Sequence, residues 1–412
     1  MNPPTPVPYS IFPTEISIEI LLEIDNLDDL AKMCQSSKQV QEICRSDYFW
    51  ERKYKQDYGI TTDNNQSWKT RYKEKYSKYK ELITPISCKH GTIGRIAEGK
   101  LYMWGKGNRG QLGNGVKNNS TIPIHIPFKK RIVSISCGKD FTGAITQNGL
   151  LYMWGKNDSY QLGIGKITRS ITSPINIKID GLVRKISCGD HCAASMTSDN
   201  AGYIWGLIGV LGEKIFEVGR YKRPTILLSH VIDISAGFET VFFVNSGFQI
   251  YQISPNTGIS TLRGNLSDHT SSFWIKTNKS IKFIYASHVI LVAVTTYGLV
   301  YHMSIDIESR LYIFKIILIQ KLPPISKISS EWGGHGTENK IIAITKDRKI
   351  FALGRNKGIP SLPHRIDTPT EIEIGYRPVH VSVSKGLTCI ITDDGYLNVW
   401  RDSAVPYRSE KY

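Results

Sequence analysis

The sequence predicts a mainly β protein: a seven-bladed β-propeller preceded by a small all-α domain. Three observations lead to this prediction. The segment Leu101–Gly105 recurs letter for letter as Leu151–Gly155, and a second landmark repeats in the same phase. Turn residues separate short apolar runs within each repeat, whereas the residues before the repeats show helical spacing. A period of about 50 residues indicates one structural unit that is copied along the chain.

Counting a single recurring position gives the number of units. Successive copies of this position, the tryptophan slot, lie 47 to 51 residues apart: Trp104, Trp154, Trp205, Gln252, Met303, Leu353 and Trp400. The second landmark begins as Ile86-Ser87-Cys88 and ends as Val381-Ser382-Val383. Short apolar runs split by Gly, Asn and Asp turns are typical of antiparallel strands. Seven units are therefore expected to form seven four-stranded blades, of which residues 247–328 fit the pattern worst.

The first two units resemble the regulator-of-chromosome-condensation repeat family. The pattern of that family is a small-residue strand, a turn glycine, a Tyr-x-Trp-Gly strand and then Gly-Gln-Leu-Gly. Unit one closes with Gly110-Gln111-Leu112-Gly113, and unit two has Tyr160 in place of the first of these glycines. The resemblance covers roughly Ile86 to Trp400 and implies a propeller over residues 86–412. It does not define an activity, because one fold hosts many functions.

Residues 1–85 show a different, helical pattern. The apolar residues of the first helix recur at spacings of four, four and three: Ile16, Ile20, Ile24 and Leu27. This spacing is the mark of an amphipathic helix. A second helix is expected around Leu30 and a third around Ile43.

The order of residues in this segment resembles an F-box, with Leu-Pro-x-Glu-Ile near the start, then Ile-Leu, Asp-Leu and a late Trp. Phe12 stands where the family has leucine. The resemblance implies an F-box-like domain that binds a Skp adaptor and, through it, a cullin scaffold. The partner-binding residues carried over by position are Phe12, Pro13, Ile16, Ile20, Leu21, Leu30 and Trp50. The alternative is a small helical cap on the propeller that uses the same residues as core.

Aromatic residues at helical spacing connect the two parts. They are Trp68, Tyr72, Tyr76 and Tyr79, with lysine and arginine residues between them. We expect a connecting helix that lays its aromatic face on the propeller and leaves its basic side in solvent. A nucleic-acid-binding helix is the alternative.

Composition limits the environment and the partners. The formal net charge of +16 favours contact with nucleic acid, chromatin or an acidic protein face. No apolar run approaches the roughly 18 residues of a membrane span, and the N-terminus lacks a signal-peptide pattern. We therefore expect an intracellular protein, cytoplasmic or nuclear, without a membrane partner, whose 7 cysteines are reduced thiols.

Two motifs suggest chemistry but lack the context that the chemistry needs. Residues 105–110 match Gly-x-Gly-x-x-Gly, yet no helical pattern follows to receive a pyrophosphate. The run from Cys188 to Cys192 has no second cluster to complete a zinc site. Within it, Asp190 and His191 are expected to hydrogen-bond the loop. The sequence thus predicts no enzyme, no cofactor and no metal.

Two functions remain from different classes. The leading hypothesis is a non-catalytic substrate-recognition adaptor of a Skp–cullin–F-box ubiquitin ligase, with the propeller binding an unknown protein target. The alternative is a chromatin-binding or GTPase-exchange propeller with a helical cap.

Overall fold

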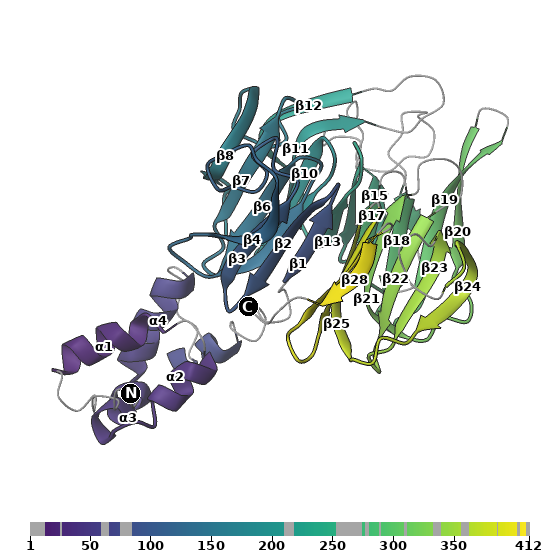
Figure 1. Ribbon diagram of the computed structural model, residues 1–412. Coiled ribbons are helices and arrows are strands. Elements are labelled where there is room, and N and C mark those ends of the chain that lie inside the picture. Colours follow the sequence, from purple (N-terminus) through teal and green to yellow (C-terminus); the bar gives the residue numbers. More distant parts are fainter. Residues whose placement is uncertain are drawn as a thin grey trace. The chain divides into compact units, whose positions relative to one another are not determined.

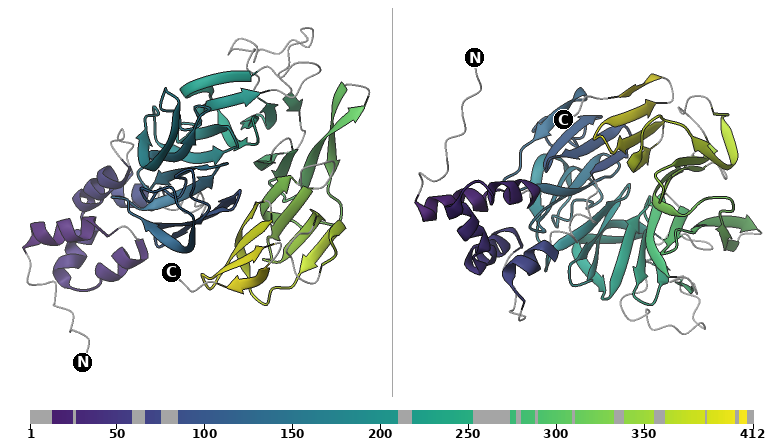
Figure 2. Two further views of the ribbon diagram at one scale, coloured as in Figure 1. Left: turned by 45° about the horizontal axis from the view of Figure 1, so that its top comes forward. Right: turned by 90° about the horizontal axis from the view of Figure 1, so that it is seen from below.

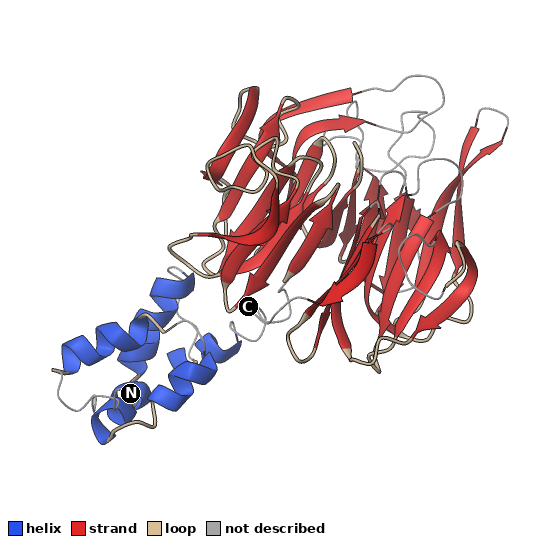
Figure 3. Cartoon of the chain, viewed as in Figure 1, coloured by secondary structure: helices blue, strands red, loops and turns tan. Residues whose placement is uncertain are grey.

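The computed structural model divides into a helical unit, which contains Met1–Ile83, and a propeller unit, which contains Thr84–Ile145 and Leu150–Tyr412 (Figure 1). It describes residues 13–24, 27–58, 66–74, 85–209, 218–252, 274–276, 280–287, 290–308, 311–332, 339–355, 362–384, 386–401 and 404–408. Over these residues the helices belong to the first unit and the strands to the second (Figure 3). None of the described helices has the length and apolar character needed to cross a membrane.

Short helices build the first unit, and one buried cation joins two of them. They are α1 (Thr14–Leu22), α2 (Leu27–Met33), α3 (Lys38–Arg45) and α4 (Asp47–Tyr58), and residues 68–74 are also helical. Lys53 of α4 is fully buried, and its Nζ donates to the carbonyl oxygen of Leu22 at 2.6 Å. A cation at a helix C-terminus satisfies a free carbonyl and complements the helix dipole. The predicted helical region is therefore present.

The buried face of the first helix differs from the predicted one. Helix α1 ends at Leu22, whereas the regular spacing of apolar residues in the sequence continues to Leu27. Its buried residues are Ser17, Leu21 and Leu22, whereas Ile16 is 46% exposed. The predicted face was wrong within the helix itself, because the buried Ser17 and Leu21 each lie one residue after Ile16 and Ile20.

The aromatic residues of the connecting segment pack within the helical unit. Tyr72 lies 5.3 Å from Trp50 and Trp68 lies 5.4 Å from Tyr54, measured between ring centroids. The described part of the aromatic face thus packs on α4. Two further members of the pattern lie outside the described residues: Tyr76 and Tyr79.

The cysteines correct a second expectation. Cys34, just after α2, and Cys44 of α3 form a disulfide. The prediction that all 7 cysteines are thiols is therefore wrong for this pair. The remaining five are buried thiols: Cys88, Cys137, Cys188, Cys192 and Cys389.

Seven four-stranded antiparallel sheets follow one another around the propeller (Figure 2). Blade 1 holds β1 (Ile86–Lys89), β2 (Thr92–Ala97), β3 (Lys100–Gly105) and β4 (Ser120–Ile126). Blade 2 holds β5 (Ile132–Cys137), β6 (Phe141–Thr146), β7 (Leu151–Asn157) and β8 (Thr168–Ile177). Blade 3 holds β9 (Val183–Cys188), β10 (Cys192–Thr197), β11 (Gly202–Gly209) and β12 (Val218–Leu228). Blade 4 holds β13 (Val231–Ala236), β14 (Val241–Asn245), β15 (Gln249–Gln252) and β16 (Trp274–Lys276).

The remaining three blades keep the same strand order, and this confirms the seven-bladed propeller. Blade 5 holds β17 (Ile281–Ser287), β18 (Ile290–Thr295), β19 (Val300–Glu308) and β20 (Leu311–Leu318). Blade 6 holds β21 (Ile325–Trp332), β22 (Asn339–Thr345), β23 (Ile350–Arg355) and β24 (Arg365–Ile372). Blade 7 holds β25 (Pro378–Ser384), β26 (Leu387–Thr392), β27 (Leu397–Arg401) and β28 (Ala404–Arg408).

The tryptophan slot falls on the third strand of each blade. Its four tryptophans are buried: Trp104, Trp154, Trp205 and Trp400. In blade 4 the residue that was assigned to the tryptophan slot is out of register by one position. The slot residue should pair with the second-strand residue that itself pairs with the last residue of the landmark triplet. In blade 4 that second-strand residue is Val241, which pairs with Ala236, but Gln252 pairs with Phe242. The assignment of Gln252 was therefore one residue early, which places its side chain on the opposite face of the sheet.

A serine in the first strand of a blade links it to the next blade. The hydroxyl oxygen accepts a hydrogen bond from a backbone N–H of the following first strand, at 2.7–2.9 Å. We call these six serines the serine ring: Ser87, Ser136, Ser187, Ser235, Ser329 and Ser382. Each is the middle residue of a second-landmark triplet. This explains physically why Ile-Ser-Cys repeats in phase.

The same bond closes the ring between its two ends. Blades 1 and 7 share no strand among the described residues, since each is built from four consecutive strands. Instead, Ser382 Oγ accepts from the Cys88 N–H at 2.9 Å, and Ser384 Oγ accepts from the His90 N–H at 2.8 Å. Arg95 adds a 2.6 Å bond from Nη2 to the carbonyl oxygen of Gly395. Closure thus depends on side chains and packing between complete blades.

A second bond between blades explains why Gly-Gln-Leu-Gly accompanies the tryptophan. The Trp154 indole N–H donates to the carbonyl oxygen of Gln111 at 2.8 Å, and Trp205 donates to Gln161 at 2.9 Å. Gly113 lies against the Trp154 indole, where a Cβ atom would stand 2.7 Å from Nε1. Each turn therefore receives the tryptophan of the next blade, and glycine is needed for the close approach.

Candidate functional site

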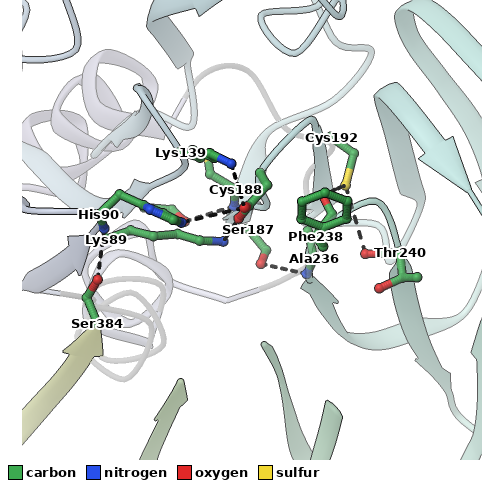
Figure 4. A network of polar contacts seen from close by, with 12 residues as sticks. Lys89, His90, Lys139, Ser187, Cys188, Cys192, Ala236, Phe238, Thr240 and Ser384 are labelled. Carbon is green, nitrogen blue, oxygen red and sulfur yellow. Dashed lines mark hydrogen bonds and ion pairs between the residues drawn. The ribbon is translucent and has the colours of Figure 1, made fainter. Parts of the chain in front are cut away.

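Loops from four consecutive blades meet at one polar network (Figure 4). Each loop joins the first and second strands of its blade and directly follows a second-landmark triplet. The loops contribute Lys89 and His90 from blade 1, Lys139 from blade 2, Asp190 and His191 from blade 3, and Phe238 from blade 4. Backbone bonds fix their order: the Lys139 N–H donates to Gly189 O at 3.1 Å, and the Asp190 N–H donates to Gly237 O at 3.0 Å. We call these six residues the axial cluster.

Asp190 is the centre of the axial cluster. Its carboxylate is 7% exposed and lies 2.9 Å from Lys89 Nζ, 3.5 Å from His90 Nε2 and 3.8 Å from Lys139 Nζ. Burial alone would raise its pKa, but the attraction of Lys89 and His90 outweighs burial and lowers the pKa well below its usual value. Burial would likewise lower the pKa of Lys89, but Asp190 and Glu331 raise it. Both charges are therefore retained at neutral pH.

The groups around this buried pair remain partly exposed. His191 meets Phe238 edge to face, with ring centroids 5.3 Å apart, and Lys139 Nζ lies 5.8 Å from the Phe238 ring centre. Burial lowers the pKa of His191, so its imidazole is neutral at pH 7 although Asp190 is close. The imidazole Nδ1 lies 3.5 Å from the Ser159 hydroxyl of blade 2, so its described hydrogen bond is to a neighbouring blade and not to its own turn. The exposed part of the cluster thus offers cations, imidazoles and an aromatic ring.

The chemistry available to the axial cluster is recognition. Burial raises the pKa of the Cys188 thiol to about 12, and that of Cys192 rises as well, so these thiols stay protonated. Over the described residues no three His, Cys, Asp or Glu side chains are grouped to hold a metal ion. Asp190 is permanently charged and neutralised by its neighbours, which is unsuited to proton transfer near pH 7.

The glycine-rich motif of the sequence lies in a loop. Residues 106–119 connect β3 and β4 through turns, with no helix after Gly110. The dinucleotide-binding pattern needs a helix N-terminus at this point. Here the glycines shape the turn that receives Trp154.

The partner-binding residues predicted for the helical segment divide by exposure. Phe12 lies outside the described residues. Pro13 and Ile16 are exposed, and Ile20 is half-buried. The other three are buried: Leu21, Leu30 and Trp50. The indole N–H of Trp50 donates to the carbonyl oxygen of Cys44 at 2.7 Å, which ties it into the helical unit.

Sequence reasoning did not single out most of the axial cluster. It identified Asp190 and His191 as loop residues, but it missed the other four members: Lys89, His90, Lys139 and Phe238. The signal was present, since each of these residues comes one or two positions after a second-landmark triplet. Aligning the triplets and reading the next residues would have collected the whole cluster, because equivalent loops of a propeller surround one axis.

Comparison with known proteins identifies the repeats. The model of the regulator of chromosome condensation (RCC1) repeat matches residues 98–145 and 148–196. The human E3 ubiquitin-protein ligase HERC2 is 36% identical over 150 residues, which cover 34% of this chain and 3% of that protein. A Protein RCC2 homolog from Xenopus laevis is 34% identical over 123 residues, which cover 29% of this chain and 24% of that protein.

The chain therefore spans a small part of the length of these curated relatives. Among solved structures, Prp20p from Saccharomyces cerevisiae aligns with a TM-score of 0.58 at 14% identity, covering 77% of this chain and 82% of that one. This likeness concerns the fold. The identification is therefore limited to two statements: residues 98–145 and 148–196 are regulator-of-chromosome-condensation repeats, and they belong to a seven-bladed β-propeller.

Proposed function

We propose that the chain is a non-catalytic interaction protein whose propeller binds a protein partner at the axial cluster. The observation that supports this is the partly exposed set of cations, imidazoles and one aromatic ring around the buried Lys89–Asp190 pair. Charges of both signs are nearly balanced there, because Asp190 and Glu239 lie close to Lys89 and Lys139. A balanced, partly aromatic surface suits a folded protein partner better than a uniform polyanion.

The matched proteins suggest the class of this partner. Prp20p of Saccharomyces cerevisiae binds Gsp1p and histones. We infer a partner of this chromatin and GTPase class for the present chain. This favours the alternative of the sequence analysis over its leading hypothesis.

Pull-down experiments test the proposal. Immobilised full-length protein is incubated with histone octamers and with a Ran-type GTPase, and His90→Ala with Lys139→Ala is the test variant. Both residues are partly exposed, so the fold should persist, as a thermal melt would show. Binding of at least one partner that the variant loses supports the proposal. Equal binding by wild type and variant, or no binding by either, contradicts it.

A second candidate function concerns the helical unit. We propose it as a Skp-adaptor contact, because Ile16 is an apolar side chain with 46% exposure next to the exposed Pro13. Co-purification of a Skp adaptor with wild type but not with Ile16→Asp would support a ubiquitin-ligase adaptor. Tyr48→Asp on α4 is the matched control, since Tyr48 is 59% exposed and outside the motif. Equal co-purification by wild type and Ile16→Asp would reject this contact.

A further inference from the structure

The outer edge of blades 1 to 3 carries a row of exposed cations. They lie in the loops after β3 and β7 and on the outer strands β8 and β12. We call this set the basic rim: Arg109, Lys117, Lys166, Arg169, Arg220, Lys222 and Arg223. All seven side chains are exposed, and none forms an ion pair with a described carboxylate.

Backbone bonds make the basic rim one continuous surface. The loop of blade 1 lies on the outer strand of blade 2, since the Gly115 N–H donates to the Thr172 carbonyl oxygen at 2.9 Å. The loop of blade 2 lies on the outer strand of blade 3 in the same way, with Gly165 donating to Lys222 at 2.8 Å. The repeat geometry thus joins the cations of three blades, and β8 and β12 are neighbours in Figure 1.

Carboxylates are nearly absent from this surface. Over residues 106–119, 156–177 and 218–228, the one acidic residue is Asp158, which pairs with Lys156 at 2.9 Å. The outer strand of blade 6, β24, instead carries Asp367 and Glu371. An uncompensated row of cations creates a positive potential that suits a polyanion, in contrast to the balanced axial cluster.

One aromatic residue on the basic rim holds an unusual conformation. Tyr160 has φ +60°, and its counterpart in blade 1 is Gly110 with φ +80°. A bulky side chain is costly in this left-handed region, so the turn geometry itself does not call for tyrosine at this position. The ring is half-buried, and Lys222 Nζ lies 6.0 Å from its centre.

We propose that the basic rim binds single-stranded nucleic acid, with its cations on the phosphates and the Tyr160 ring stacked on a base. Aromatic rings within a positive surface are the common way to hold unpaired bases, because every base offers a face for stacking. Four of the seven cations are arginines, whose planar guanidinium groups bind phosphate through two hydrogen bonds. This surface and this partner differ from those of the proposed function, so either can fail alone.

Salt dependence tests the role of the cations. Fluorescence anisotropy measures the binding of a labelled oligothymidylate by the full chain over a range of salt concentrations. For single strands, each cation on a phosphate contributes about 0.7 to the slope of log affinity against log salt. The rim variant Lys117→Gln/Arg169→Gln/Arg220→Gln should therefore flatten the slope by about 2. A slope equal to that of the wild type overturns the proposal.

A matched variant separates the basic rim from net charge. Lys321→Gln/Arg365→Gln/Arg377→Gln removes the same charge from exposed positions of the other blades. This control should keep the wild-type slope. Equal flattening by both variants would show a diffuse attraction and overturn the proposal.

Variants of Tyr160 distinguish a role in binding from a purely structural role. Tyr160→Gly installs the residue of blade 1 and relieves the left-handed strain, so the melting temperature should stay level or rise. Affinity for the oligothymidylate should fall about tenfold, and Tyr160→Phe should keep it because the ring remains. Unchanged affinity in Tyr160→Gly overturns the proposal. So does binding of duplex DNA or polyglutamate as tight as that of the single strand.

Discussion

Blades 1–3 and blades 4–7 have the same strand order but are joined in different ways. The serine ring runs through both regions. The tryptophan–glutamine bond is described only at the boundaries of blades 1, 2 and 3, where Gln111 receives Trp154 and Gln161 receives Trp205. The serine hydrogen bond thus links blades in both regions, whereas the tryptophan–glutamine hydrogen bond is an additional link between blades 1, 2 and 3.

The difference explains where the repeat can be recognised. The matched residues, 98–145 and 148–196, lie in the region that has both bonds. Blades 4–6 lack the tryptophan and the Gly-Gln-Leu-Gly turn together. Blade 7 nevertheless has Trp400 although residues 354–364 of blade 6 contain no Gly-Gln-Leu-Gly, so the tryptophan and the turn can occur separately.

Blade 5 shows how the serine joint can be replaced. Its landmark has Tyr285 in place of serine, and Ser329 Oγ of blade 6 donates to the phenol oxygen at 3.2 Å. Burial raises the pKa of Tyr285 to about 12, which keeps the phenol neutral. The link between neighbouring blades at this position is therefore a hydrogen-bonded hydroxyl group, which is usually supplied by serine.

Replacement of Trp154 should show the largest difference between the two regions. Trp154→Ala removes a fully buried indole and leaves the Gln111 carbonyl without its donor, so we expect a loss of about 3–5 kcal/mol of unfolding free energy. Leu353→Ala, in the equivalent slot of blade 6, removes a half-buried side chain and should cost about 2 kcal/mol or less. Urea denaturation of both variants measures the two values, and equal losses would contradict the distinction.

The axial cluster should be nearly as sensitive. Asp190→Asn removes the nearest counter-charge of Lys89, whose side chain is 14% exposed, so we expect a loss of about 3–5 kcal/mol at pH 7. Because folding lowers the pKa of Asp190, its contribution is complete above the unfolded value of about 3.9 and is lost as the pH falls below it. Melting curves of wild type and variant should therefore converge in acid. A difference that stays constant down to pH 3 would reject the role of the carboxylate charge.

The propeller could be predicted from the sequence because the recurring residues are the ones that form hydrogen bonds between neighbouring blades. Trp154 and Ser87 each bond a neighbouring blade, so their spacing equals the blade repeat. The axial cluster was harder to predict, since the residues two positions after the triplets share no residue type: His90, Lys139, Asp190 and Phe238. The face of α1 was also missed, because the packing that buries Ser17 and Leu21 leaves no mark in the spacing of the isoleucines.

Single serines should have a moderate effect in both regions. Ser235→Ala leaves the buried N–H of Ala286 without an acceptor, and Ser136→Ala does the same to Cys188. Each change should cost about 1–3 kcal/mol. Hydrogen exchange should show faster opening at the blade 4–5 boundary in the first variant, because no tryptophan–glutamine bond is described there. Equal protection at the two boundaries would contradict the idea that the tryptophan–glutamine bond reinforces blades 1–3.

Mild acid should weaken blade 7 more than the axial cluster, where burial also lowers the pKa of His191. Burial, together with the nearby charge of Lys327, lowers the pKa of His380 on β25 to about 4, whereas an unfolded histidine has a pKa of about 6.5. Its contribution to stability is therefore complete above pH 6.5 and is lost as the pH falls toward 4, because the unfolded chain binds the proton more readily. Asp190 keeps its charge over this interval. Amides of β25 should accordingly lose more exchange protection than those of β9 between pH 6.5 and 4, after correction for the intrinsic exchange rate. His380→Gln should remove this pH dependence; a variant that retains it would assign the titration to another group.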